Sequence, residues 1–129
     1  MNILFYSTVT DQIGERLLRM VHEEVSGERL EYFQNMAALQ RGLSQTAAMP
    51  AIAVLCPADR ENLAELVALH ELIRDTHIIL VLPDRDEETI ALGHKLRPRF
   101  LSFTNSDLQD VAAVFAKIFD NDRRKKYLH

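Results

Sequence analysis

Two kinds of apolar pattern alternate along this chain, and the alternation limits the possible folds more than any other feature. Each short run of β-forming residues is followed by a stretch in which apolar residues recur every three to four positions, as on one helix face. The β-forming runs lie at residues 3–6, 30–33, 52–55, 78–82 and 100–103. Five strand–helix units in strict alternation predict a parallel sheet with helices on both faces.

The third and fourth runs, AIAVLC and HIILVLP, are almost wholly apolar, which is typical of strands buried on both faces. With right-handed crossovers, five such units favour the flavodoxin-like, doubly wound arrangement with strand order 2-1-3-4-5. The chain has 129 residues, enough for one α/β domain with a core of its own. We place this domain at residues 1–120 and expect a short basic tail at 121–129, which contains the run Arg123–Lys126.

Composition excludes several classes of function. A net charge of −4 argues against a surface that binds nucleic acid, because phosphate binding needs a basic face. No apolar stretch approaches the ~20 residues that cross a bilayer, and the amino-terminal residues lack the pattern of a secretory signal. The single cysteine, Cys56, allows no internal disulfide and fits a reducing compartment. We therefore expect a cytoplasmic protein that binds neither nucleic acid nor a membrane.

Ligands of an open parallel sheet bind beyond the carboxyl ends of its strands. The residues expected there are Ser7, Thr8, Cys56, Leu82, Phe103 and Thr104. They offer hydroxyl, thiol and apolar groups, with no carboxylate or amine.

The segments PAIAVLCP, THIILVLPD and RFLSFTNSDLQDV resemble the receiver domain of two-component response regulators, and the similarity spans about residues 1–120. A working receiver carries an acidic pair after its first strand and a phospho-accepting aspartate after its third. It carries a hydroxyl residue after its fourth strand and a lysine after its fifth. At these positions this sequence has Ser7-Thr8, Cys56, Leu82 and Phe103, so no catalytic residue is carried over.

These substitutions remove the usual chemistry of a receiver. Mg²⁺ takes hard oxygen ligands, normally including carboxylates, and thiols are too soft for it. Phosphoryl transfer also needs charge stabilisation that an apolar Phe103 ring cannot supply, and we expect this ring to plug the pocket. The resemblance therefore implies a degenerate pseudo-receiver in a two-component or phosphorelay-type system. We expect no enzyme activity and no cofactor or metal, and action through protein–protein interaction.

Receivers typically bind partners or dimerise through the fourth helix, the fifth strand and the fifth helix. We therefore expect a signalling protein as partner, or a second copy of this chain in a homodimer. The exposed candidates on that surface are His94, Lys95, Arg97, Arg99 and Lys117. Ordinary solvated surface explains any one of them equally well.

A second resemblance supports an alternative function. The stretch YSTVTDQI after the first strand resembles the flavodoxin phosphate loop, whose hydroxyls and amides bind phosphate at a helix N-terminus. Thr8 and Thr10 match two of its hydroxyl positions, whereas Asp11 replaces its glycine and Ile13 its last threonine. The alternative is thus a binding protein for phosphate, a nucleotide or FMN that uses the Ser7–Thr10 loop. Against FMN, the loops CPADREN and PDRDEE carry no aromatic residue.

Other polar residues have simpler structural interpretations. No two histidines have the spacing of a helical zinc pair, and His70 shares the apolar face of the third helical stretch, as a core or boundary residue would. Cys56 ends an apolar strand, as a small core residue would. Asp59 and Asp86 are candidate helix N-caps, and Ser106 begins a capping-box pattern.

Overall fold

The computed structural model describes residues 2–8, 12–25, 29–45 and 50–127, and five parallel strands form its centre. The strands are β1 (Asn2–Ser7), β2 (Arg29–Phe33), β3 (Ile52–Cys56), β4 (His77–Leu82) and β5 (Phe100–Phe103). The helices are α1 (Gln12–Glu24), α2 (Met36–Gln45), α3 (Arg60–Ala68), the 3-10 turn η1 (His70–Ile73), α4 (Glu87–His94) and α5 (Leu108–Tyr127). The strand order is β2-β1-β3-β4-β5, which confirms the predicted fold class.

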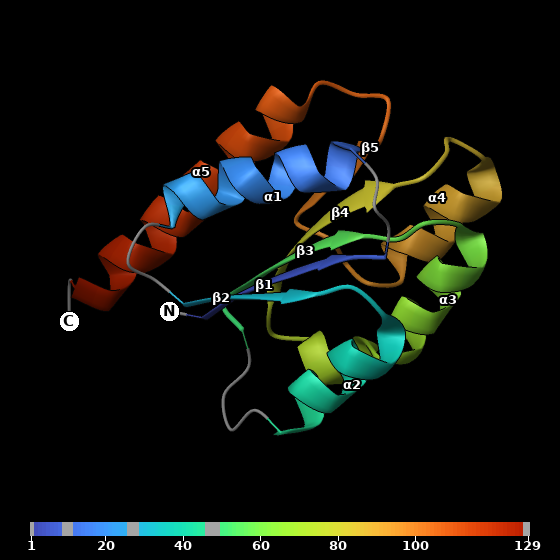
Figure 1. The fold of residues 1–129 in the computed structure, drawn as a ribbon, viewed down its shortest axis with the longest axis horizontal. Helices are drawn as coiled ribbons and strands as arrows, with labels where there is room; N and C mark the ends of the chain where they lie inside the picture. The colour runs from blue at the N-terminus through green and yellow to red at the C-terminus, as the bar shows by residue number, and fades with distance from the viewer. Residues whose placement is uncertain (1, 9–11, 26–28, 46–49, 128–129) are drawn as a thin grey trace.

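Helices cover both faces of the sheet: α1 and α5 lie on one side and α2, α3 and α4 on the other (Figure 1). Strand residues alternate between the two layers. Phe5 and Val54 pack with Phe115 of α5, whereas Tyr6 and Leu55 pack in the cluster under α2, α3 and α4. Because both layers are apolar, the central strands are continuous apolar runs. None of the described helices combines the length and the apolar composition that crossing a membrane requires.

The third helical stretch differs from the prediction. Helix α3 ends at Ala68, and the chain tightens into η1, which rotates His70 away from the sheet. The His70 side chain is exposed, and its ring Nδ1 lies 2.8 Å from the carbonyl oxygen of Val67. The expectation that His70 belongs to the core or its boundary is wrong, because the helical period does not continue past Ala68.

Helix α4 also presents an unexpected face. Ala91 and His94 are exposed, and the residues that the helix buries are Thr89 and Gly93. A Cβ atom on Gly93 would lie 3.0 Å from a methyl group of Leu80, so glycine allows the helix to approach β4 closely.

The helix termini confirm one predicted cap and correct two. Asp59 caps α3 by accepting a hydrogen bond from the amide of Asn62 over 2.8 Å. Asp86 occupies the N-cap position of α4 without a side-chain cap bond. The cap of α5 is Asp107, which accepts from the amide of Gln109 over 2.9 Å, and not Ser106. An aspartate one residue closer to the helix serves as the stronger acceptor at this terminus.

Helix α5 runs without a break to Tyr127. Residues 121–127 therefore continue this helix, and the division into a domain at 1–120 and a basic tail at 121–129 stays a prediction. Residues 128–129 lie outside the described part of the chain.

Candidate functional site

A hollow of about 220 Å³ lies at the carboxyl ends of β1, β3 and β4, where the topology predicts a site. Its strand-end residues are Ser7, Cys56, Val81, Pro83 and Thr104. The first turn of α1 and the residues between β3 and α3 complete the lining. Ser7 is 3% exposed and Cys56 is 9% exposed, so only the mouth of the hollow is open to solvent.

The structure brings three of the expected strand-end residues together at the hollow: Ser7, Cys56 and Thr104. Ser7 and Cys56 are register partners on adjacent parallel strands, and both line the hollow. Thr8 follows directly and does not line it. The Thr8 Oγ1 atom is buried and has no hydrogen-bond partner among the residues that the structure describes.

The other two predicted residues lie on the opposite face of the sheet. Leu82 and Phe103 are register partners, and both belong to the apolar cluster under α2, α3 and α4. Phe103 therefore does not plug the hollow. The guanidinium of Arg85 lies over its ring, 4.0 Å from the ring centroid.

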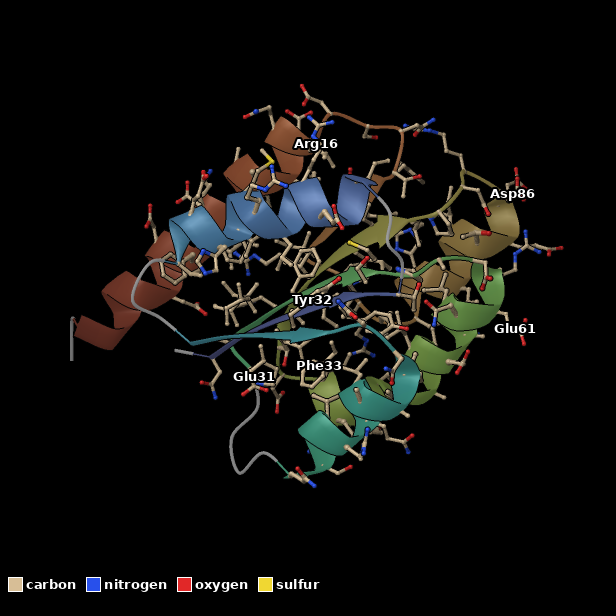
Figure 2. All side chains as sticks on the ribbon, viewed as in Figure 1. Arg16, Glu31, Tyr32, Phe33, Glu61 and Asp86 are labelled. Carbon is tan, nitrogen blue, oxygen red and sulfur yellow. The ribbon has the colours of Figure 1, made fainter. Side chains whose placement is uncertain are left out.

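A shift of one residue explains this difference, because neighbouring strand residues point to opposite faces. Figure 2 shows this alternation on β2, where Tyr32 and Phe33 lie on opposite sides of the strand. On β4 and just after β5, the residues that face the hollow are Val81 and Thr104. Thr104 is among the residues expected at the strand ends, whereas Val81 is not, and the polar residues Ser102 and Thr104 alternate with apolar ones in RFLSFTN.

The residues that line the hollow differ in part from the expected ones, but the described ones also lack charge. No described lining residue carries a carboxylate, an amine or a guanidinium. Within the described ranges, no group of three or more histidine, cysteine, aspartate or glutamate side chains could hold a metal ion. The hydroxyls of Ser7 and Thr104 bring no charge to neutralise Mg²⁺, and the thiol of Cys56 is too soft a ligand for it.

Among the described residues, two acidic side chains that follow β3 and β4 take part in local structure. Asp59 caps α3, and Asp84 accepts a hydrogen bond from the amide of Asp86 over 2.9 Å. This backbone bond, together with hydrogen bonding to Thr89 and the charge of Arg60, lowers the pKa of Asp84 below its usual value. The Asp84 carboxylate is thus held in a turn beside the hollow.

An arginine joins the two helices that start at this rim. Arg60 of α3 donates from Nη2 to Asp86 over 3.0 Å, from Nη1 to Glu88 over 2.7 Å and from Nε to the hydroxyl of Thr89 over 3.1 Å. Figure 2 shows Asp86 and Glu61 on the same side of the molecule, where α4 and α3 begin.

The predicted interaction surface lies apart from the hollow. All of its residues are exposed, at the end of α4, in the α4–β5 connection, at the start of β5 and on α5: His94, Lys95, Arg97, Arg99 and Lys117. None of the five lines the hollow. In the alternative phosphate loop, Thr10 and Asp11 lie outside the described residues, so the structure places only Thr8 of the two matching threonines.

Comparison with solved structures identifies the fold. A CheY-like response regulator receiver domain protein from Methanospirillum hungatei matches with a TM-score of 0.73 and 13% identity, over 96% of this chain and 97% of that one. A pilus assembly-related protein from Burkholderia pseudomallei matches with a TM-score of 0.65 and 19% identity, over 92% and 90%. A pilus assembly protein from Burkholderia thailandensis matches with a TM-score of 0.66 and 18% identity, over 93% of this chain and 98% of that one.

No family model and no curated protein matches the sequence. The chain therefore has the fold of a response-regulator receiver domain, and the described residues that line the hollow at its strand ends are uncharged. This assignment rests on structure, because every identity given above is below 20%.

Proposed function

We propose that this chain is a receiver-type signalling module that works through contact with a protein partner and accepts no phosphoryl group at its strand ends. The observation that carries the proposal is that the described residues lining the hollow are all uncharged. Phosphoryl transfer depends on charge stabilisation by a metal ion and by cationic groups. The described lining has no carboxylate to hold a metal ion and no cationic side chain.

The test is incubation with acetyl phosphate and Mg²⁺ followed by intact-mass measurement. A receiver that has the usual acidic site is treated in parallel as the positive control. We expect a phosphorylated species for the control and an unchanged mass for this chain. Cys56→Asp should also stay unmodified, because Ser7 and Thr104 still supply no charge. A stoichiometric phosphoprotein in the unaltered chain would overturn the proposal.

The contact surface proposed for the partner comprises the cationic and histidine side chains around α4, β5 and α5, which were named above as the predicted interaction surface. Its exposed cations favour a partner with an acidic face, and complementary charge speeds and orients association. Because two proteins of similar fold are named for pilus assembly, partners are sought among proteins of surface-appendage assembly as well as among signalling proteins. The single cysteine favours the cytoplasm as the place of this contact.

Charge reversal tests this surface. The double variant Arg97→Glu/Lys117→Glu should lose a partner that the unaltered chain captures from its host. Arg41→Glu, on the exposed surface of α2, is the matched control and should retain that partner. Equal capture by both variants would place the contact elsewhere. A concentration-dependent dimer that only the double variant disrupts would identify a second copy as the partner.

One observation keeps the phosphate-binding alternative testable. The Thr8 Oγ1 atom is buried without a hydrogen-bond partner in the described structure, and this hydroxyl could donate a hydrogen bond to a phosphate oxygen. We expect neither inorganic phosphate nor FMN to raise the melting temperature. A rise that is lost in Thr8→Val would support the alternative and count against the proposal.

A further inference from the structure

The connection between β4 and α4, residues 83–86, is tied to a neighbouring element on each of its two sides. On one side, Arg85 donates from Nε to Asn105 over 3.3 Å and from Nη2 to Ser106 over 3.1 Å, in the loop after β5. Its guanidinium also lies over the ring of Phe103. A cation above an aromatic face adds a further attraction at this contact.

On the other side, Arg60 of α3 binds the start of α4. Its three donors reach Asp86, Glu88 and Thr89, so one planar guanidinium fixes three positions of a single helix terminus. A lysine could not reproduce this arrangement, because its ammonium is a point charge without the rigid fork of arginine.

Thr89 connects this exposed network to the interior. The residue is fully buried, and its hydroxyl accepts a hydrogen bond from Nε of Arg60. Asp84, at the start of the same connection, accepts from the amide of Asp86. Loss of Arg60 therefore removes a partner from a buried hydroxyl, which costs more than loss of an exposed ion pair.

Helix α4 depends on these ties because its own packing is limited. It has only eight residues, and the two that it buries are a threonine and a glycine. Its apolar contacts come from Ile90 and Leu92, which are only partly buried against the apolar cluster, and the polar contacts add to this attachment.

We infer that Arg60 and Arg85 form a two-sided lock that holds the β4–α4 connection and the first turn of α4 in one arrangement. The lock consists of Arg60 with Asp86, Glu88 and Thr89, and of Arg85 with Phe103, Asn105 and Ser106. It goes beyond the proposed function, because it describes how the rim is held whether or not a phosphoryl group is ever accepted.

Hydrogen exchange of the full chain, followed by mass spectrometry, tests the lock. Arg60→Gln and Arg85→Gln should each speed exchange in residues 84–92 by about threefold to tenfold, and the double variant should speed it further. Arg60→Lys should behave like Arg60→Gln, because charge alone does not replace the fork. Arg74→Gln is the matched control, since Arg74 is an exposed arginine that contacts the neighbouring acidic residues of η1 and its end.

Amides of β1 and β3 report global unfolding in the same experiment. In all variants we expect them to exchange as in the control, which separates local release of α4 from a loss of the whole fold. Exchange in residues 84–92 that matches the Arg74→Gln control would overturn the lock. Exchange of this segment in the unaltered chain at the rate of an unstructured peptide would also overturn it. Neither result bears on phosphorylation, so failure of the lock and failure of the proposed function are distinguishable.

Discussion

The side-chain amide of Asn62 donates a hydrogen bond to the buried hydroxyl of Tyr6 over 2.8 Å and so joins α3 to β1 inside an apolar layer. The Asn62 side-chain oxygen accepts from the amide of Ala58 over 3.0 Å. Both polar ends of Asn62 are therefore satisfied at the base of the rim. Such a pair positions α3, and with it Arg60, relative to the end of the sheet.

Removing the Tyr6 hydroxyl should destabilise the fold. Tyr6→Phe leaves the buried amide of Asn62 without its acceptor, and we expect the free energy of unfolding to fall by about 1–2 kcal/mol. Urea unfolding measures this change. Tyr32→Phe, on the partly buried edge strand, is the control and should cost less than about 0.5 kcal/mol. Equal losses of unfolding free energy in the two variants would show that the hydrogen bond between Tyr6 and Asn62 does not stabilise the fold.

Titration of Asp84 should report the network around Thr89. The amide of Asp86, the hydroxyl of Thr89 and the charge of Arg60 lower the pKa of Asp84 in the folded chain. A lowered pKa means that the stabilisation is present above the pKa of the unfolded chain and is lost as the pH falls through the folded value. Carboxyl NMR should show the Asp84 pKa rising towards its ordinary value in Thr89→Val.

The control for this titration is Thr76→Val, which removes a buried hydroxyl that donates to the carbonyl of Pro50, away from Asp84. It should leave the Asp84 pKa unchanged. The same Asp84 pKa in both valine variants would contradict the role given to Thr89.

A carboxylate placed at Cys56 should be poorly tolerated. Cys56→Asp buries an acidic group in a hollow whose described lining has no cation, which raises the pKa of the new carboxyl. A raised pKa means that the variant is least destabilised below the ordinary aspartate pKa and loses stability as the pH rises through the folded value. Urea unfolding near pH 5 and pH 8 should show a larger loss at the higher pH. Cys56→Ser, which introduces no charge, should show no such difference.

Gly93 should be the position in α4 that tolerates enlargement least. In Gly93→Val the new side chain meets the methyl groups of Leu80 and Leu82, and overpacking of this kind costs about 1–3 kcal/mol. Ala91→Val, on the exposed side of the same helix, carries the same β-branched residue without the contact. It should cost about 0.5 kcal/mol in urea unfolding. A smaller loss at Gly93 than at Ala91 would contradict the observed packing of α4.

The sequence predicted the fold better than it predicted which residues face the hollow. The alternation of apolar runs and helical stretches determined the five strands and their order, because each run is bounded by turns and caps. The run HIILVLP, however, is apolar at every central position, so nothing in it shows whether Val81 or Leu82 faces the hollow. The register between strands decides this, and it places Val81 opposite Ser102 and Leu82 opposite Phe103.

The contacts that hold the rim could not be predicted from sequence for a related reason. Arg60 and Thr89 are 29 residues apart, and no local pattern connects them. The sequence predicts Asp86 as the N-cap of a helix. In the structure its carboxylate instead accepts a hydrogen bond from Arg60, between α3 and α4. Long-range polar partners depend on how two helices pack, which apolar periodicity does not specify.

Binding of a divalent ion tests the central claim most directly. The chain is titrated with Mn²⁺ while the amide signals of Ser7, Cys56 and Thr104 are followed by NMR, beside a receiver with the usual acidic site. We predict no selective broadening at these amides at Mn²⁺ concentrations that saturate the control. Saturable broadening centred on them and reversed by excess Mg²⁺ would contradict the account, because it would show a metal site at the end of the sheet.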